Sequence, residues 1–145
     1  MSCCLIVDRS MTMRRIIRKG VLAAGYATCL EASTGLQALH RLRTDPVSLI
    51  VTGWNMPELS GLDLVCAVRH NPQTSHIPVL MVTANAVRND VLNALEVGVD
   101  QYLVKPFSHD RLLEKLIAIR NRPRHAGSTG LLTNGVARPF ECSYV

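Results

Sequence analysis

Five residues that decide the chemistry of a possible site stand directly after short apolar runs of this sequence. They are Asp8, Arg9, Gly53, Thr83 and Lys105. A carboxylate such as that of Asp8 is a ligand type that Mg²⁺ prefers, and a neighbouring cation can pair with it instead. Covalent transfer of a group through the protein needs a nucleophilic side chain, which Gly53 lacks. The set therefore suits binding better than covalent catalysis.

The elements that would position these residues are short apolar runs alternating with stretches of helical spacing. The runs typical of buried strands are Cys3–Val7, Ala27–Ala32, Val47–Thr52, Pro78–Val82 and Gln101–Val104. Helices are expected over about residues 11–24, 35–43, 62–70, 87–97 and 109–121. The expected N-caps are Ser10, Thr34 and Ser108, and Gln37 would close a capping box with Thr34.

This order of elements predicts a single α/β domain. Five β-α units in series imply a parallel sheet with helices on both faces, because crossover connections are right-handed. Ligands of such sheets bind outside the carboxyl ends of the strands, so the five residues above should lie close together. The hydroxyl of Thr52 should face away from them, because successive residues of a strand point to opposite sides.

The motifs resemble those of the response-regulator receiver (CheY-like) family. The resemblance is carried by residues 5–10 (LIVDRS), 13–16 (MRRI), 53–57 (GWNMP) with Gly61, 81–84 (MVTA) and 104–107 (VKPF). These stretches keep the family's order over residues 3–121. The resemblance implies a flavodoxin-like, doubly wound, five-stranded parallel sheet, a (β/α)5 fold with strand order 2-1-3-4-5.

The resemblance also implies a role for three residues of the site. Asp8 matches the first residue of the family's acidic pair. Thr83 matches the hydroxyl that hydrogen-bonds the phosphoryl group, and Lys105 matches the ammonium that pairs with the phosphoacceptor. A cis peptide bond is implied before Pro106.

Two positions depart from the family pattern. Gly53 stands where the family has the aspartate that is phosphorylated, and Arg9 stands where it has the second acidic residue. Because Mg²⁺ requires oxygen ligands, normally including carboxylates, we expect weak or absent Mg²⁺ binding and no cofactor. Arg9 is expected to pair with Asp8 in place of the metal; alternatively, Asp8, Arg9 and Lys105 form only a scaffold cluster of ion pairs.

These departures predict a protein that is not an enzyme and works by binding. The first hypothesis is a pseudo-receiver that cannot be phosphorylated and docks on a histidine kinase, a motor or a scaffold component in two-component or chemotaxis-type signalling. The resemblance implies docking through the fourth helix, fifth strand and fifth helix, with Tyr102 as the aromatic switch residue. A competent receiver with an unusual acceptor, Ser10 or Thr83, is a further alternative.

Arginine usage suggests a different kind of partner. The chain has 13 arginines, 3 lysines and a net charge of +5. Arginine pairs with phosphate and with the guanine edge, so the alternative function is binding of a cyclic dinucleotide, cyclic-di-GMP, as in some CheY-like proteins. The candidate residues are Arg14, Arg15, Arg18, Arg120, Arg122 and Arg124, with Arg138. We expect the first and last helices to form one basic patch, or else two solvated faces.

Composition sets the remaining expectations. Its 145 residues, 48% of them hydrophobic, suit one domain over residues 1–121, followed by a flexible basic and polar tail over residues 122–145 that is too short for a DNA-binding output domain. No run approaches the roughly 18 apolar residues of a membrane span, so a cytoplasmic location is expected. Five cysteines without zinc-ligand spacing predict reduced thiols. The oligomeric state is not predicted.

Overall fold

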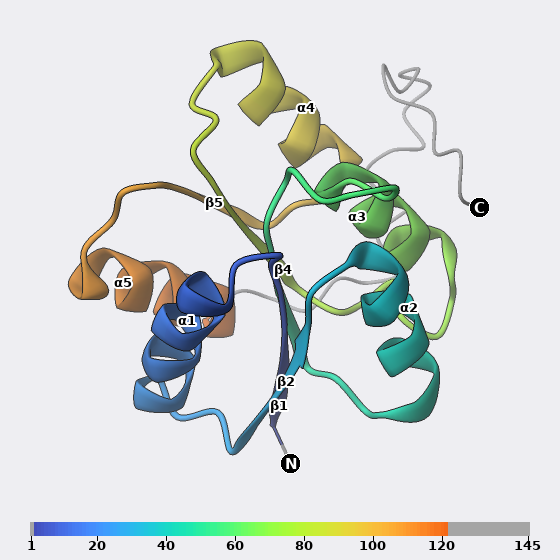
Figure 1. Ribbon diagram of the computed structural model, residues 1–145, viewed down its shortest axis with the longest axis horizontal. Coiled ribbons are helices and arrows are strands. Elements are labelled where there is room, and N and C mark those ends of the chain that lie inside the picture. The colour runs from blue at the N-terminus through green and yellow to red at the C-terminus, as the bar shows by residue number, and fades with distance from the viewer. Residues whose placement is uncertain (1, 122–145) are drawn as a thin grey trace.

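A computed structural model describes residues 2–121 of the chain, which form a parallel sheet covered by helices on both faces (Figure 1). The strands are β1 (Cys3–Val7), β2 (Thr28–Ala32), β3 (Leu49–Thr52), β4 (Val79–Thr83) and β5 (Gln101–Val104). They lie in the order β2-β1-β3-β4-β5, and every neighbouring pair is parallel. The predicted flavodoxin-like fold and strand order are confirmed.

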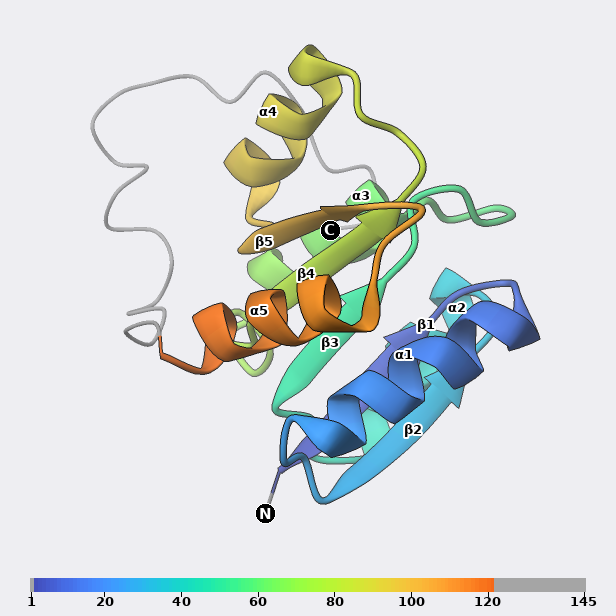
Figure 2. The ribbon, with the colours of Figure 1, turned by 90° about the vertical axis from the view of Figure 1, so that its left-hand side faces the viewer.

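Five helices cover the sheet in two layers. They are α1 (Met11–Ala23), α2 (Gly35–Thr44), α3 (Gly61–His70), α4 (Arg88–Val97) and α5 (His109–Arg120). Helices α1 and α5 pack side by side on one face, while α2, α3 and α4 cover the other (Figures 1 and 2). Successive residues of β1 alternate between the two cores, because strand side chains point to opposite faces: Leu5 packs under α2 to α4, and Ile6 under α1 and α5.

The helix caps follow the predicted signals with one exception. The side chains of Ser10 and Ser108 accept the expected bonds from backbone N–H groups three residues on. The Thr34 side chain accepts from the Gln37 N–H at 3.1 Å, but the Gln37 side chain accepts from the Ser33 N–H instead of returning to Thr34. The predicted capping box therefore forms only one of its two bonds.

Some element boundaries differ from the predicted ones by one or two residues. Strand β3 begins at Leu49 instead of Val47, and β2 begins at Thr28 instead of Ala27. Strand β4 begins after Pro78, which has no N–H to donate to a ladder. Helix α4 begins after Val87, which acts as an N-cap without a side-chain bond.

A buried arginine joins the elements at the amino ends of β4 and β5. Arg69, near the end of α3, donates to the carbonyls of Gly98 and Ile77, and its Nη2 lies 2.9 Å from Asp100 Oδ2. The same carboxylate oxygen accepts the N–H of Val79 at 2.8 Å. The end of α3 and the beginnings of two strands are thus tied by one hydrogen-bonded ion pair.

The structure bears on the expectations about membrane spans and cysteines within the described residues, and not on the predicted tail. Within residues 2–121, no helix combines the length and apolar character needed to cross a membrane. The four described cysteines, Cys3, Cys4, Cys29 and Cys66, are free thiols. Cys142 and the predicted tail over residues 122–145 lie outside the described residues.

Candidate functional site

The predicted site residues do converge at the carboxyl ends of the strands. Asp8 follows β1, Gly53 follows β3, Thr83 ends β4, and Lys105 follows β5. Asp8 and Thr83 are each only 4% exposed. The N–H of Gly53 donates to the Val7 carbonyl at 2.8 Å, which holds the end of β3 beside the end of β1. The topology thus brings together residues that lie far apart in the chain.

Asp8 is the centre of this cluster. Its Oδ2 lies 3.4 Å from the Lys105 ammonium, and its Oδ1 accepts the N–H of Ser10 at 2.8 Å. A distance of 3.4 Å is long for a charge-assisted hydrogen bond, and the Lys105 side chain remains 28% exposed. Lys105 is held by its own backbone, which donates to the Thr83 carbonyl and joins Pro106 through the implied cis bond. One carboxylate and one ammonium leave the pair electrically neutral.

The predicted pair between Arg9 and Asp8 does not form. Arg9 is exposed and makes no ion pair with any residue among 2–121. The cation that approaches Asp8 from α1 is Arg14, whose Nη1 donates to the Asp8 carbonyl at 2.6 Å while its Nε bonds Glu31 at 2.9 Å. A solvated guanidinium avoids the desolvation that a buried second cation would suffer, which accounts for the outward position of Arg9.

Gly53 is not required by the backbone. It is not among the described glycines with positive φ, and a Cβ placed on it would lie 3.0 Å from Asp8 Oδ2 and 3.6 Å from Asp8 Cγ. A side chain at position 53 would therefore point toward Asp8. Gly61 differs, because a Cβ there would overlap the carbonyl oxygen of Gly53. Its N–H donates to the Trp54 carbonyl at 2.8 Å in this close approach.

The donor set of the site does not fit Mg²⁺. Among the described residues that end or follow β1, β3, β4 and β5 in this cluster, Asp8 alone carries a carboxylate, and Lys105 and the Ser10 N–H already engage its two oxygens. Among residues 2–121, no three His, Cys, Asp or Glu side chains are grouped in a way that could hold a metal. Mg²⁺ takes oxygen ligands in near-octahedral geometry, which this cluster does not provide.

Thr83 and Tyr102 are linked through Asn85, which the sequence analysis missed. Thr83 Oγ1 accepts the Asn85 N–H at 3.2 Å, and the Tyr102 hydroxyl donates to the Asn85 carbonyl at 2.6 Å. The Tyr102 ring meets Trp54 edge to face, with centroids 6.3 Å apart. Burial, followed by the charge of Asp90, raises the pKa of Tyr102 to about 12. An asparagine two residues after a strand was the available signal, because its side chain bonds the backbone two residues on.

The response regulator receiver domain matches residues 4–117. The chain belongs to the receiver family. Over 118 residues it is 44% identical to the chemotaxis protein CheY of Pseudomonas aeruginosa, an alignment that covers 81% of this chain and 95% of that protein. It is 43% identical to CheY1 of Helicobacter pylori strain 26695 over 113 residues, covering 77% and 91%.

Solved structures agree with this assignment. The chemotaxis response regulator CheY4 of Vibrio cholerae has a TM-score of 0.75 and 31% identity to this receiver, with 82% of this chain and 98% of that chain covered. A putative response regulator from Chloroflexus aurantiacus has a TM-score of 0.77 and 28% identity, with 83% and 98% covered. The chain is therefore a CheY-like receiver, a signalling domain of the two-component type.

Two of the arginines assigned to the basic patch predicted across α1 and α5 turn away from α5. The two helices are neighbours, but Arg14 and Arg18 both turn toward Glu31 of β2, at 2.9 and 3.3 Å. The side of α1 that meets α5 carries Gly20, against Leu112. Arg14 and Arg18 thus lie on the β2 side of α1.

The remaining candidate arginines divide into two groups. Arg120 donates to the Ala24 carbonyl at 2.8 Å and lies 4.9 Å above the ring of Tyr26. Arg15 is exposed on α1. Three candidates for nucleotide binding lie outside the described residues: Arg122, Arg124 and Arg138.

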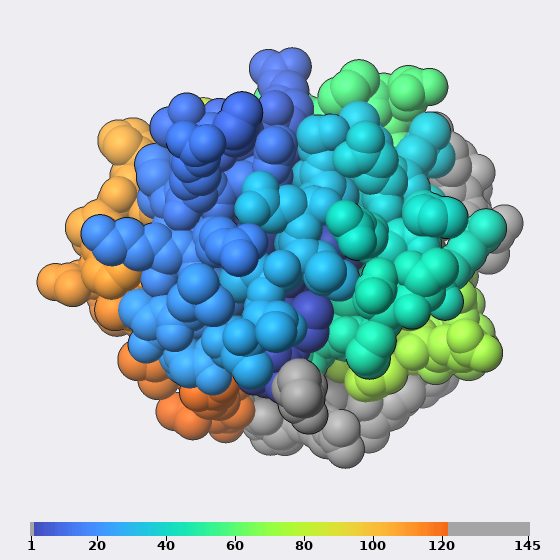
Figure 3. Space-filling model, turned by 60° about the horizontal axis from the view of Figure 1, so that its bottom comes forward, coloured from blue at the N-terminus to red at the C-terminus, as the bar shows by residue number. Residues whose placement is uncertain are grey.

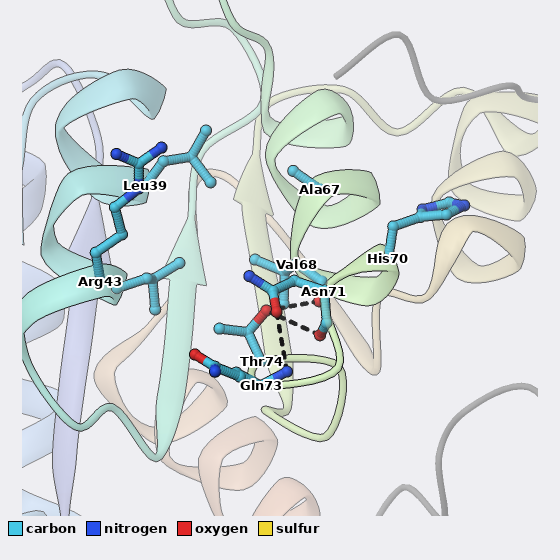
Figure 4. Close-up of a pocket in the computed structure, with 9 residues that line it drawn as sticks. Leu39, Arg43, Ala67, Val68, His70, Asn71, Gln73 and Thr74 are labelled. Carbon is cyan, nitrogen blue, oxygen red and sulfur yellow. Dashed lines mark hydrogen bonds between the residues drawn. The ribbon is translucent and has the colours of Figure 1, made fainter. Parts of the chain in front are cut away.

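A hollow of about 270 Å³ lies between α2 and α3, at the opposite end of the sheet from Asp8 (Figure 4). Its polar groups already bond the chain nearby: Thr74 Oγ1 donates to the Val68 carbonyl, and Asn71 Oδ1 accepts the Gln73 N–H. His70 points away from the other labelled side chains. The hollow is therefore separate from the cluster around Asp8.

Proposed function

We propose that this receiver accepts no phosphoryl group and acts by binding another signalling protein, such as a histidine kinase, a motor or a scaffold component. The observation that carries the proposal is Gly53, which has no side chain at the strand end where the family has its phosphoacceptor. An aspartyl phosphate needs a carboxylate as the attacking group. The two alternative acceptors each already accept a backbone N–H: Ser10 Oγ from Met13 and the buried Thr83 hydroxyl from Asn85.

Treatment with acetyl phosphate and Mg²⁺, followed by phosphate-affinity electrophoresis, tests this proposal. The wild-type chain should give no shifted band. Gly53→Asp should give one, because the backbone accepts a side chain there and Lys105 lies across Asp8 from it. Gly53→Asn is the matched control, which adds the same bulk without a nucleophile. A shifted band from the wild-type chain would contradict the proposal.

The surface around Tyr102 supports binding of a partner protein. Helix α4, strand β5 and helix α5 lie along one side of the molecule (Figure 2). Large apolar side chains are exposed on all three: Val87 (59%), Leu92 (49%), Leu95 (43%), Val104 (36%) and Ile117 (52%). Burying such side chains against a partner stabilises a complex by roughly 25 cal/mol per Å² of apolar surface removed from water, before the costs of association.

Capture of partners by the immobilised full chain from an extract of its own cells tests the role of this surface. Leu92→Glu should abolish capture of any protein that binds there, because it would bury an unpaired charge. Ile16→Glu is the control, since Ile16 is equally exposed at 46% but lies on α1. Acetyl phosphate should leave the captured amount unchanged. Tighter capture after phosphodonor treatment would contradict the proposal.

Cyclic-di-GMP binding stays an untested alternative. Of the tail-side arginines invoked for it, only Arg120 is described, and the Ala24 carbonyl and the Tyr26 ring already engage its guanidinium. Calorimetric titration of the full chain with cyclic-di-GMP would decide it. Binding at micromolar concentration would support the nucleotide function. The absence of a heat of binding at that concentration would rule this function out.

A further inference from the structure

Strand β2 forms one open edge of the sheet. It pairs with β1 on one side and with no other strand among residues 2–121. Figure 3 shows this face of the molecule, where the surface of β2 lies between those of α1 and α2. Four of the five β2 residues are partly or fully exposed. An edge of this kind presents unpaired backbone groups that can pair with another chain.

The register of β2 identifies which groups are free to pair. The Thr28 N–H donates to the Ser2 carbonyl at 3.2 Å, and the Ala32 carbonyl accepts the Asp8 N–H at 3.1 Å. In a parallel ladder, alternate residues bond the same neighbour, so residues 28, 30 and 32 bond β1. Cys29 and Glu31 therefore direct their N–H and C=O groups toward the open edge.

A groove runs beside this edge along α2. An open hollow of about 700 Å³ is lined by Glu31 of β2 and by five residues of α2: Leu36, Gln37, His40, Arg41 and Thr44. Leu36 is 49% exposed and contributes an apolar surface. The unpaired backbone groups thus lie next to a space that can receive side chains.

The two helices that flank β2 carry only positive charge. Helix α1 contains Arg14, Arg15, Arg18 and Lys19, helix α2 contains Arg41 and Arg43, and neither contains Asp or Glu. Each of the other three helices contains at least one acidic residue. Glu31 is shared between Arg14 and Arg18, so one carboxylate faces two guanidiniums, and the Arg18 side chain is still 45% exposed. The edge therefore retains excess positive charge.

We propose that the β2 edge binds an extended acidic segment of another protein, which adds to the sheet as a sixth strand. The outward groups of Cys29 and Glu31 pair with the backbone of this segment. Because its side chains alternate, acidic residues on one side reach Arg18 of α1 and those on the other side reach Arg41 of α2.

Charge argues against two other occupants of the β2 edge, a second copy of this chain and residues 122–145. A second copy of β2 offers one acidic residue, Glu31, and brings its own two basic helices. Residues 122–145 contain three arginines and one glutamate, which is also the wrong sign. The proposal does not depend on the state of the phosphorylation pocket, because no residue of the Asp8 cluster lines this groove.

The test uses the full chain and a capped eight-residue peptide of two Glu-Glu-Val-Val repeats, which places acidic side chains on both faces of an extended strand. Binding is followed by fluorescence anisotropy of a dye on the peptide, and amide exchange of the protein is followed by NMR. The amides of Cys29 and Glu31 should exchange more slowly when the peptide is bound, whereas the Leu30 amide, already bonded to β1, should change little. A peptide N-methylated at every residue should lose affinity, because neither of its edges keeps N–H groups that can pair.

Variants separate the contribution of an arginine beside the β2 edge from the attraction that the net charge of the whole protein exerts on an acidic peptide. Arg41→Glu should weaken peptide binding by roughly fivefold or more. Arg88→Glu is the matched control, because it makes the same change of charge at an exposed residue of α4. Its affinity for the peptide should stay within about twofold of the wild-type value. Equal losses in the two variants would reduce the interaction to nonspecific attraction and overturn the proposal.

Three further outcomes would overturn it. Equal affinity for the same peptide with Lys in place of every Glu would show that the charge of the flanking helices does not select the partner. Protection of the Cys29 and Glu31 amides that rises with protein concentration would assign the edge to a second copy. Protection of the same amides at every dilution, without peptide, would mean that the chain covers its own edge.

Discussion

Two ion pairs lie at opposite ends of the same sheet, and they differ in how completely they are buried and bonded. At the amino ends, Arg69 and Asp100 have side chains only 4% and 2% exposed and lie 2.9 Å apart. At the carboxyl ends, the side chains of Asp8 and Lys105 are 6% and 28% exposed, and Asp8 Oδ2 lies 3.4 Å from Lys105 Nζ. The first pair is enclosed by acceptors from three segments, whereas the ammonium of the second still reaches water.

The difference separates a structural role from a binding role. A fully bonded buried pair can be broken only at a high cost, because the remaining partner would be left as an uncompensated buried charge. A partly exposed lysine keeps donors available and loses little when its partner changes. The amino end of the sheet therefore holds α3, β4 and β5 in place, while the carboxyl end keeps a partly hydrated ion pair.

Removing the arginine of the amino-end pair should have the largest effect on stability. Arg69→Ala should lower the free energy of unfolding by about 3–5 kcal/mol, because Asp100 would remain buried without its cation. Urea denaturation followed by circular dichroism measures this change. Arg88→Ala, an exposed arginine on α4, is the control and should change stability by less than about 0.5 kcal/mol. Similar losses in both variants would refute the structural role of Arg69.

Two glycine variants should sharpen the description of the carboxyl end. Gly61→Ala should cost about 2–3 kcal/mol, because its Cβ would overlap the Gly53 carbonyl oxygen and force the backbone apart. Gly53→Ala should cost less than about 1 kcal/mol, since its Cβ meets a side-chain oxygen of Asp8 at 3.0 Å, which can give way. Thermal unfolding of the two variants side by side makes the comparison. An equal loss would mean that the backbone does require glycine at position 53.

Neutralising the carboxyl-end pair should have a smaller effect. Asp8→Asn should lower the free energy of unfolding by about 1 kcal/mol, because Lys105 can be hydrated and the amide oxygen can still accept the Ser10 N–H. The same urea experiment measures it. A loss as large as that of Arg69→Ala would remove the contrast between the two ends of the sheet.

Tyr102 should give the smallest effect and a pH signature. Its pKa of about 12 when folded lies above the ordinary value of 10.0, so the unfolded chain binds fewer protons between these values. The stability from this group is present below pH 10 and is lost as the pH rises toward 12. Tyr102→Phe should cost about 0.5–1 kcal/mol at neutral pH through the lost bond to Asn85.

The pH dependence of stability provides the control for this prediction. The wild-type chain should lose stability more steeply than Tyr102→Phe between pH 10 and 12. Parallel curves for the two proteins would show that the hydroxyl of Tyr102 titrates as it does in the unfolded chain. Burial also raises the pKa of Tyr26, but Tyr26 is present in both proteins, so its contribution cancels in the comparison.

The fold was largely predictable because the signals were local. Short continuous apolar runs and cap residues such as Ser10 predicted the elements and their order, and the motif resemblance implied the strand order. Boundaries were less accurate, because strands begin where a partner can pair, as at Leu49, and not where apolar residues begin. The approach of Asp8, Gly53 and Lys105 at the strand ends followed from topology, whereas Arg9 turns outward.

Side-chain partners were harder to predict. Arg9 stands next to Asp8 in sequence, yet the cation near Asp8 on the helix side is Arg14, because one turn of α1 carries it back over the strand end. The pairing of Arg14 and Arg18 with Glu31 joins residues more than ten positions apart, and no periodic signal marks it. Orientation around a helix axis and competition among several carboxylates decide such contacts.

The contact between Trp54 and Tyr102 makes the domain suited to optical measurement. Trp54 is the only tryptophan of the chain, and it stands next to Gly53 with the ring of Tyr102 edge-on at 6.3 Å. Its emission is therefore placed to respond both to a charge introduced at position 53 and to a partner that displaces the β5 tyrosine. Events at the strand ends and on the α4-β5-α5 side can thus be followed in solution through one intrinsic fluorophore.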